Sequence, residues 1–287
     1  MILITGATGH LGKSVVDQLL TKTTPNKIAI LARDAEKAKD FKAKGIDVRI
    51  GDFDNSNSLN EALKGIEKVL LISGVDPVNR LQQHKNVIDA AKLNGVKLIA
   101  YTSVTMENFS NSDNQFLMGS HFLTEDYIKE SGLAFTFFRN NLYTDTILMF
   151  AGENPFETGI TLPTAKGKVG FALRREIGEA IANDLLSNYN ENKIYEITGS
   201  EAYSYADVAS ELSKLSGKTV TYTELESEDY KGILEKAGVP EHFIQVFTAF
   251  AADIKNNQHS KVTSDLEILL GRKPINFSSA LKELYKL

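Results

Sequence analysis

The sequence predicts an α/β fold in which a doubly wound parallel sheet carries helices on both faces. Two observations support this prediction. Short apolar runs alternate with longer helical segments over the first part of the chain, and a glycine-rich turn follows the first apolar run. A smaller α/β lobe is expected to follow the main sheet.

The glycine-rich turn lies within the first twelve residues, MILITGATGHLG, after a predicted buried strand at Ile2–Ile4. The first glycine permits the tight turn, the second lets a pyrophosphate approach the backbone, and the third lets the next helix lie close on the sheet. The first N–H groups of that helix, predicted over about 11–21, form an anion site. The residues expected to contact a cofactor here are Gly6, Ala7, Thr8, Gly9, His10, Leu11 and Gly12.

A glycine triplet alone also fits a tight turn that binds no ligand. Here a strand precedes it, a helix follows it, and a second strand is predicted at 27–31, so the context favours a dinucleotide-binding Rossmann fold. We expect residues 1–145 to form this cofactor domain, with a returning strand near 193–198, and residues 146–287 to form a smaller substrate-binding lobe.

Composition narrows the functional classes. The net charge of −5 argues against nucleic acid or an anionic membrane as the main partner. The absence of cysteine removes disulfides and thiolate metal sites, and no apolar run is long enough to span a membrane. Met1 leads directly into the first strand, which leaves no room for a signal peptide. We expect a cytoplasmic monomer or homodimer without a metal site.

Arg33 follows the second strand in the segment LARD. Rossmann domains that prefer NAD carry an acidic residue at this position, which binds the adenosine ribose. A guanidinium instead suits the 2′-phosphate of NADP. The alternative is a surface arginine that pairs with Asp34 or Glu36, and the glycine turn upstream favours the phosphate.

The ends of the third and fourth strands, at 47–50 and 69–72, are expected to border the cofactor. Asp52 and Phe53 can flank an adenine, although Asp52 equally fits a turn or cap. Gly74 leaves space for the nicotinamide half of the cofactor, next to Ser73. A short helix at 56–63 lies between these two strands.

The fifth strand, at 97–102, follows a helix at 78–94 and closes at Thr102 and Ser103, which are expected to contact the cofactor. Conventional short-chain dehydrogenases carry a catalytic serine near this place. Their Tyr-x-x-x-Lys pair is missing from the helix that follows. The one match in the chain joins Tyr189 to Lys193 within NYNENK, a polar stretch that predicts a surface loop, so we reject it.

The helix where that pair would lie contains His121 and Glu125, one turn apart and therefore on one face. A solvated helix face and a histidine beside the substrate both fit this spacing, because histidine can donate a proton near neutral pH. A metal site does not fit, since the five histidines are scattered along the chain.

The sixth strand, at 133–138, ends in polar side chains at the carboxyl edge of the sheet. Asn140 and Tyr143 are candidates to line the nicotinamide or the substrate. Arg139 fits either that site or a buried structural ion pair.

The segments TGATGHLG, LARD, LLISG, KLIAYTSV and HFLTEDYIKESGLAFTFFRNNLYTD resemble the NmrA-like group of atypical short-chain dehydrogenases. Within that group the chain is most similar to type 2 bacterial NAD(P)H:quinone oxidoreductases and to triphenylmethane reductases. Asp126 departs from the quinone enzymes, which carry lysine there, and is closer to the dye reductases. The resemblance implies NADP at the glycine turn and Arg33, flanked by Ser73, Gly74 and Val75. It also implies that the nicotinamide lies beside Asn140, Asn141, Leu142 and Tyr143.

The rest of the chain alternates more loosely. Residues 146–167 predict a loop over the carboxyl edges of the strands, and further strands are predicted at 168–172, 193–198 and 220–225. Helices are predicted at 174–186, from a cap at Ser204 to residue 215, and after residue 225. An aromatic stripe on the last of these predicts core packing or one wall of an apolar pocket, and consists of Phe243, Val246, Phe247 and Phe250.

These observations predict an NADPH-dependent reductase of a quinone or another flat electrophile. Such acceptors need no tuned general acid, because the reduced quinone is a stabilised anion and a reduced cationic dye is neutral. His121 and Tyr143 are the candidate catalytic residues. The alternative is a redox sensor of the NmrA type that binds NADP without turnover. An isoflavone-type or azo reductase ranks lower, because Lys129 does not match a catalytic lysine position.

Overall fold

The computed structural model describes residues 1–187 and 191–287. Its main element is a parallel sheet whose strands lie in the order β3-β2-β1-β4-β5-β6-β8. The order reverses between β1 and β4, which is the topological switch point of a doubly wound fold. In chain order the strands are β1 (Ile2–Ile4), β2 (Ile28–Ala32), β3 (Asp47–Ile50), β4 (Lys68–Leu71), β5 (Leu98–Val104), β6 (Ala134–Asn140) and β8 (Lys193–Ile197).

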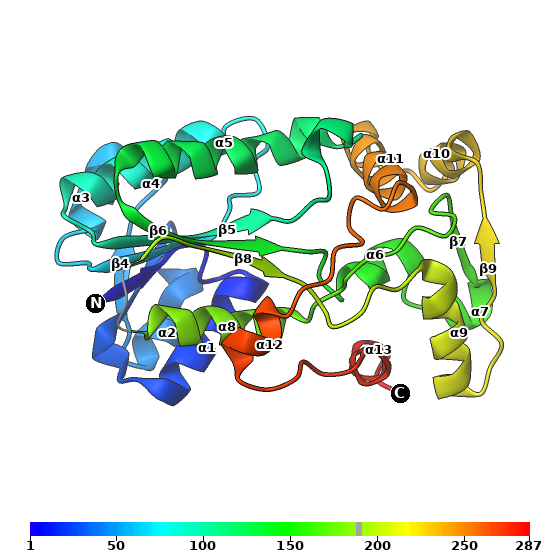
Figure 1. The fold of residues 1–287 in the computed structure, drawn as a ribbon. Coiled ribbons are helices and arrows are strands. Elements are labelled where there is room, and N and C mark those ends of the chain that lie inside the picture. The colour runs from blue at the N-terminus through cyan, green and yellow to red at the C-terminus, as the bar shows by residue number, and fades with distance from the viewer. Residues whose placement is uncertain (188–190) are drawn as a thin grey trace.

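Helices cover both faces of this sheet, as predicted (Figure 1). One face packs against α3 (Ser56–Ala62), α4 (Arg80–Leu93) and α5 (Gln115–Ser131). The other packs against α1 (His10–Lys22), α2 (Lys39–Ala43), α8 (Arg174–Leu185) and α12 (Asp265–Leu270). Strand residues alternate between the two cores, so that Leu3 belongs to the first and Ile4 to the second.

A smaller group of elements lies beyond the carboxyl ends of the strands, on the right in Figure 1. Its apolar cluster joins a two-stranded parallel sheet to five helices and the short α7. These elements are α6 (Thr146–Ala151), α7 (Pro155–Thr158), β7 (Ile160–Leu162), α9 (Tyr205–Ser216), β9 (Tyr222–Glu224), α10 (Ser227–Lys236), α11 (Glu241–Lys255) and α13 (Phe277–Tyr285). The division of the chain at residue 145 stays a prediction.

Most predicted elements of the sheet are confirmed within a few residues, and the predicted return of the chain is confirmed because β8 pairs with β6. The predicted cap at Ser204 is also confirmed, since its hydroxyl accepts the Asp207 N–H and the Asp207 carboxylate accepts the Ser204 N–H. Tyr189, half of the rejected pair, lies outside the described residues, whereas Lys193 begins β8.

Two predictions for the second half are wrong. Residues 146–167 are not a loop, because they contain α6, α7 and β7. The glycine and proline residues there mark helix ends. Pro155 is the first residue of α7, while Gly152 and Gly159, both at positive φ, are the C-caps of α6 and α7. The strand expected at 168–172 is reduced to isolated bridges, because Gly170 donates its N–H to the His259 carbonyl instead of to a strand.

Short 3-10 helices occur at Pro25–Lys27, Glu36–Ala38 and Phe109–Asn111. Among the helices of the described ranges, none combines the length and the apolar character needed to cross a bilayer.

The glycine turn fixes how closely α1 approaches the sheet. Gly6 has a φ of +60°, which a β-carbon would strain. A β-carbon on Gly12 would lie 2.2 Å from the Gly6 carbonyl oxygen and 2.7 Å from the Ala7 α-carbon. Backbone atoms cannot move aside cheaply, so any larger residue at position 12 must distort the turn.

We therefore expect Gly12→Ala to lower the free energy of unfolding by about 1–3 kcal/mol, because the new methyl overpacks the turn. Urea unfolding followed by circular dichroism measures this. Gly232→Ala in α10 is the matched control, since its β-carbon would meet open space and should be neutral or stabilising by up to about 1 kcal/mol. Equal urea midpoints for Gly12→Ala and the unmodified protein would contradict the packing argument.

Candidate active site

The carboxyl ends of β1 and β4 present an open backbone cradle. Gly6, Thr8, Gly9 and His10 are exposed, while Ala7 and Leu11 beneath them are buried. Gly9 is the N-cap of α1, and no side chain caps the helix there. A β-carbon on Gly9 would meet only the Gly6 carbonyl, at 3.3 Å, so internal packing does not require this glycine. A helix N-terminus without a side-chain cap, beside a bare backbone, fits a pyrophosphate.

Arg33 follows β2 at the same edge of the sheet and is exposed. In the described part of the chain no carboxylate pairs with it. The alternative partners are otherwise engaged, because Asp34 accepts the Glu36 N–H at 2.9 Å and Glu36 pairs with Lys39. The guanidinium is therefore available for an anion such as a ribose phosphate.

Asp52 and Phe53 follow β3. One Asp52 oxygen accepts the Asp54 N–H at 3.0 Å, so the turn interpretation describes its contact in the structure. Phe53 is half-buried and meets the ring of His84 edge-on at 6.5 Å. The expected adenine contact of these two residues stays a prediction.

The loop after β4 is tied to the sheet and to α4. The Ser73 N–H donates to the Thr102 hydroxyl at 2.9 Å, and the Gly74 N–H donates to Nε2 of His84 at 3.0 Å. The Gly74 carbonyl accepts from Nε of Arg80 at 2.8 Å. Val75, by contrast, is 94% exposed. The backbone of this loop is thus fixed by hydrogen bonds to β5 and α4, while its tip at Val75 is exposed to solvent.

His84 is a buried neutral imidazole whose tautomer follows from its contacts. Because Nε2 accepts from Gly74, the proton lies on Nδ1, which is 3.0 Å from the Thr124 hydroxyl. That hydroxyl donates onward to the Ser120 carbonyl at 2.7 Å. Burial, and then the charge of Arg80, lower the pKa of His84 to about 3.

His121 contacts Tyr101, a residue that the sequence analysis did not single out. The Tyr101 hydroxyl lies 3.0 Å from Nδ1 of His121, and burial raises the pKa of this phenol. Burial, followed by the charges of Arg80 and His84, lowers the pKa of His121 to about 3. The expected role of His121 as a proton donor stays a prediction, and the lowered pKa keeps its ring neutral near pH 7.

Glu125, one turn further along α5, serves a structural ion pair. It is 1% exposed and binds Arg139 through two bonds of 2.9 and 2.6 Å, and Arg139 also reaches Glu196 at 3.2 Å. The structural interpretation of Arg139 is thus the one observed. This network joins α5, β6 and β8 below the candidate site.

Tyr143 and its neighbours follow β6. The Tyr143 phenol lies 3.5 Å from Nδ2 of Asn140, the Arg174 guanidinium lies 4.5 Å from the ring centre, and burial raises the pKa of the phenol. The Asn141 amide is used within the protein, since it donates to the His259 carbonyl and accepts the Leu142 N–H. Leu142 packs against the apolar cluster of the second lobe.

Two buried polar atoms at this edge have no partner among the described residues. They are the Ser103 hydroxyl, at the end of β5, and Oδ1 of Asn140, at the end of β6. An unsatisfied buried polar atom costs about 1–3 kcal/mol, so such atoms signal a missing partner. Together with the open cradle at Gly9, they fit a dinucleotide that extends from β1 across the ends of β4, β5 and β6.

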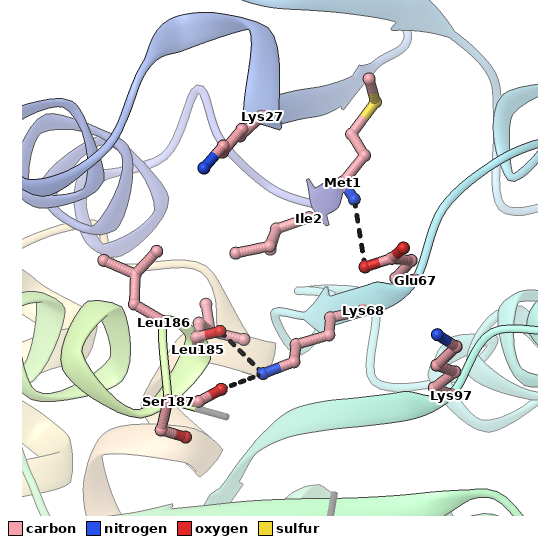
Figure 2. Close-up of a pocket in the computed structure, with 9 residues that line it drawn as sticks. All are labelled: Met1, Ile2, Lys27, Glu67, Lys68, Lys97, Leu185, Leu186 and Ser187. Carbon is pink, nitrogen blue, oxygen red and sulfur yellow. Dashed lines mark hydrogen bonds and ion pairs between the residues drawn. The ribbon is translucent and has the colours of Figure 1, made fainter. Parts of the chain in front are cut away.

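A separate pocket of about 440 Å³ lies at the opposite edge, where the strands begin (Figure 2). Lys27, Lys68 and Lys97 line it, and Lys68 donates to the carbonyls of Leu185 and Ser187. It is remote from the glycine turn, which follows the carboxyl end of β1, so it plays no part in the candidate site.

The sequence analysis missed Arg80, His84 and Tyr101. A signal was present, because Arg80 and His84 are four residues apart at the start of a predicted helix and hence share one face. Tyr101 gave no such signal, since an aromatic residue inside an apolar strand is typical of core packing.

This fold and site define a Rossmann-type dinucleotide-binding protein. The sequence profile of the NmrA-like family matches residues 1–279, and the chain belongs to that family. It is 38% identical to quinone oxidoreductase 2 of Escherichia coli over 84% of this chain and 83% of that one. It is 29% identical to the NAD(P)H azoreductase of Xenophilus azovorans over 98% and 97%.

Solved structures agree with the sequence relatives. The triphenylmethane reductase of Citrobacter sp. superposes with a TM-score of 0.93 at 34% identity, covering 100% of this chain and 99% of the other. The NADPH complex of an E. coli NADPH-dependent quinone oxidoreductase has a TM-score of 0.93 at 32% identity, covering 99% and 100%. The Rossmann-like fold is therefore that of proteins seen with NADPH bound.

Three poorly solvated histidines, of which His84 and His259 are fully buried, predict a pH-dependent stability. His84, His121 and His259 have pKa values lowered from 6.5 to about 3, 3 and 4, mainly by burial. Below about pH 6.5 the unfolded chain takes up protons that the folded chain does not. Stability is therefore full at neutral pH and falls as the pH drops toward 4, by up to about 1.4 kcal/mol per pH unit for each histidine.

Urea unfolding at several pH values between 7.5 and 4.5 measures this slope. His259→Leu should reduce it by about one proton, since the His259 ring is fully buried and neither nitrogen has a described partner. His242→Gln, which changes an exposed histidine, is the control variant with which the slope of His259→Leu is compared. The same slope in both variants would contradict the assignment of His259.

Proposed function

We propose that the protein is an NAD(P)H-dependent reductase that transfers hydride from NADPH to a quinone or a similar flat electrophile. The printed functions of its relatives, a quinone oxidoreductase and an azoreductase, support the coarser assignment of an NAD(P)H-dependent oxidoreductase. The observation that carries the proposal is the uncapped glycine cradle at β1, combined with unsatisfied polar atoms at the ends of β5 and β6.

The residues present would hold NADPH in a defined direction. The backbone of the glycine turn would bind the pyrophosphate, and Arg33 the 2′-phosphate. The nicotinamide half would then lie past the switch point, near Gly74, Ser103 and Asn140. When bound, the dinucleotide supplies a hydride, which is two electrons and one proton.

The acceptor chemistry fits a site without a general acid. Within α5 the one tyrosine, Tyr127, is followed four positions later by Ser131 and donates to Asp89 on the surface. Hydride addition to a quinone turns one carbonyl into an oxyanion, and a proton from water completes the hydroquinone. The oxyanion is a stabilised phenolate, so orientation of the two rings supplies most of the catalysis.

The second lobe would provide the acceptor wall. Phe250 of α11 packs against a cluster formed by Val104 and Met106, at the end of β5, and by Met118 of α5. Its ring meets Phe150 of α6 at 6.4 Å. Phe243 on the same helix is 50% exposed. The aromatic stripe of α11 therefore reaches from the carboxyl edge of the sheet toward solvent, as a wall of an apolar pocket would.

The first experiment follows NADPH oxidation with a panel of quinones, an azo dye and a cationic triphenylmethane dye. We expect turnover with at least one acceptor class, with one NADP formed for each two-electron reduction of the acceptor. Tight NADPH binding without oxidation of any acceptor would reject the reductase and favour an NADP sensor.

Arg33→Asp should weaken NADPH binding by roughly tenfold to a hundredfold and leave NADH binding within about threefold, since only NADPH carries the 2′-phosphate. Isothermal titration with both cofactors measures the two affinities. Lys22→Asp, the same charge reversal at the far end of α1, is the control and should change neither. Equal losses for both cofactors with Arg33→Asp would refute the phosphate contact.

A further inference from the structure

Arg80 is a buried cation without a counter-ion. Its side chain is 5% exposed, and no carboxylate lies within ion-pair distance of it among the described residues. Its partners are neutral: Nε donates to the Gly74 carbonyl at 2.8 Å, and Nη1 donates to the Leu117 carbonyl at 2.9 Å and to the Ser120 hydroxyl at 3.0 Å. Buried charges in proteins are ordinarily paired, so this one calls for a function.

The position of Arg80 is the candidate site itself. It begins α4, directly after the loop that leaves the carboxyl end of β4, and it bridges that loop to the first turns of α5. Its Nη2 has no hydrogen-bond partner in the described part of the chain. The guanidinium therefore lies between the Gly74 loop and the helix that carries His121, at the sheet edge where the nicotinamide half is expected.

The groups around Arg80 form no ion pair with it among the described residues, and Asp76 acts on its charge only at longer range. His84 of α4 and His121 of α5 are neutral at physiological pH, and the phenol of Tyr101 in β5 is protonated. Asp76 in the loop uses its carboxylate on the Val78 and Asn79 amides and is too far for an ion pair. Arg80 is thus a fixed positive charge in a poorly solvated place, whereas Arg174, beside Tyr143, is paired with Asp145.

We propose that Arg80 is a specificity-determining residue, which makes the site favour uncharged acceptors that become anions over acceptors that are cations. A neutral quinone that accepts hydride becomes a hydroquinone monoanion, which the guanidinium stabilises before water supplies the proton. A cationic triphenylmethane dye becomes neutral when its central carbon accepts hydride, and its entry beside Arg80 is opposed by like charge. This inference rests on the proposed reductase function. Among the candidate acceptors of that function, it selects quinones over cationic dyes.

The test compares kcat/KM for benzoquinone and for malachite green, a cationic dye, with NADPH as donor. Arg80→Gln should move the ratio of the two values toward the dye by at least about tenfold, while Arg80→Lys, which keeps the charge, should stay within about threefold of the unmodified protein. A role in packing alone would lower both reactions together and leave the ratio unchanged.

Arg49→Gln is the matched control. It removes the same charge from an arginine that also donates to backbone carbonyls, of Ala62 and Lys64, but on the edge strand β3. The acceptor ratio should not move. An active enzyme whose ratio is the same with and without Arg80 overturns this inference alone, whereas a protein that reduces neither acceptor overturns the reductase function and the inference with it.

A second measurement needs no variant and applies if Arg80→Gln does not fold. Benzoate and phenyltrimethylammonium are compared as inhibitors of the unmodified enzyme, competitive with the quinone. The anion should bind at least about tenfold more tightly than the cation. Equal binding, or tighter binding of the cation, overturns the inference.

Discussion

Helix α1 packs closely on both sides through a glycine, and the rest of the architecture depends on these two close contacts. On one side Gly12 lets the helix touch the turn after β1, where a β-carbon would lie 2.2 Å from a backbone oxygen. On the other side Gly178 of α8 faces Ser14, and a β-carbon there would lie 2.3 Å from its hydroxyl oxygen. Because α8 precedes β8, which pairs with β6, the thickness of this layer sets where the chain rejoins the sheet. The Gly12 contact also places the N-terminus of α1 beside the cofactor cradle.

The sequence predicts the sheet well because continuous apolar runs leave little ambiguity. Strands such as Leu98–Val104 are buried on both faces, so most of their residues are apolar and the strand is recognised as one continuous apolar run. The second lobe is harder, since its strands are three residues long and its glycines end helices. Short elements are stabilised by tertiary contacts. A short window of sequence carries no information about these contacts. Hence Pro155 and Gly159 suggested a loop where α7 forms.

Site residues divide along a similar line. A glycine turn has a local signature, because three φ and packing requirements fall within seven residues, from Gly6 to Gly12. Around Arg80 the local signal is weaker: Arg80 and His84 share a helix face, but the groups that Arg80 binds come from the loop after β4 and from α5. His121 was recognised as a candidate, but its neutral state depends on burial and on Arg80, forty-one positions earlier in the chain. The sequence shows that a histidine is present, whereas the surroundings of its ring set its pKa and hence its charge at neutral pH.

Charge, more than acid–base chemistry, distinguishes this site from that of a conventional short-chain dehydrogenase. A tyrosine–lysine pair stabilises an alkoxide by giving it a proton. Here the buried imidazoles are kept neutral and the phenol of Tyr101 is kept protonated, so a fixed guanidinium is the principal charge near the Gly74 loop. A fixed charge can stabilise an oxyanion without itself being consumed, and it needs no proton to be restored between turnovers. Such a site is suited to an acceptor whose reduced form is already a stable anion, and it gives little help to a plain ketone. In the proposed reductase, the missing pair and the unpaired arginine would therefore favour the same class of acceptor.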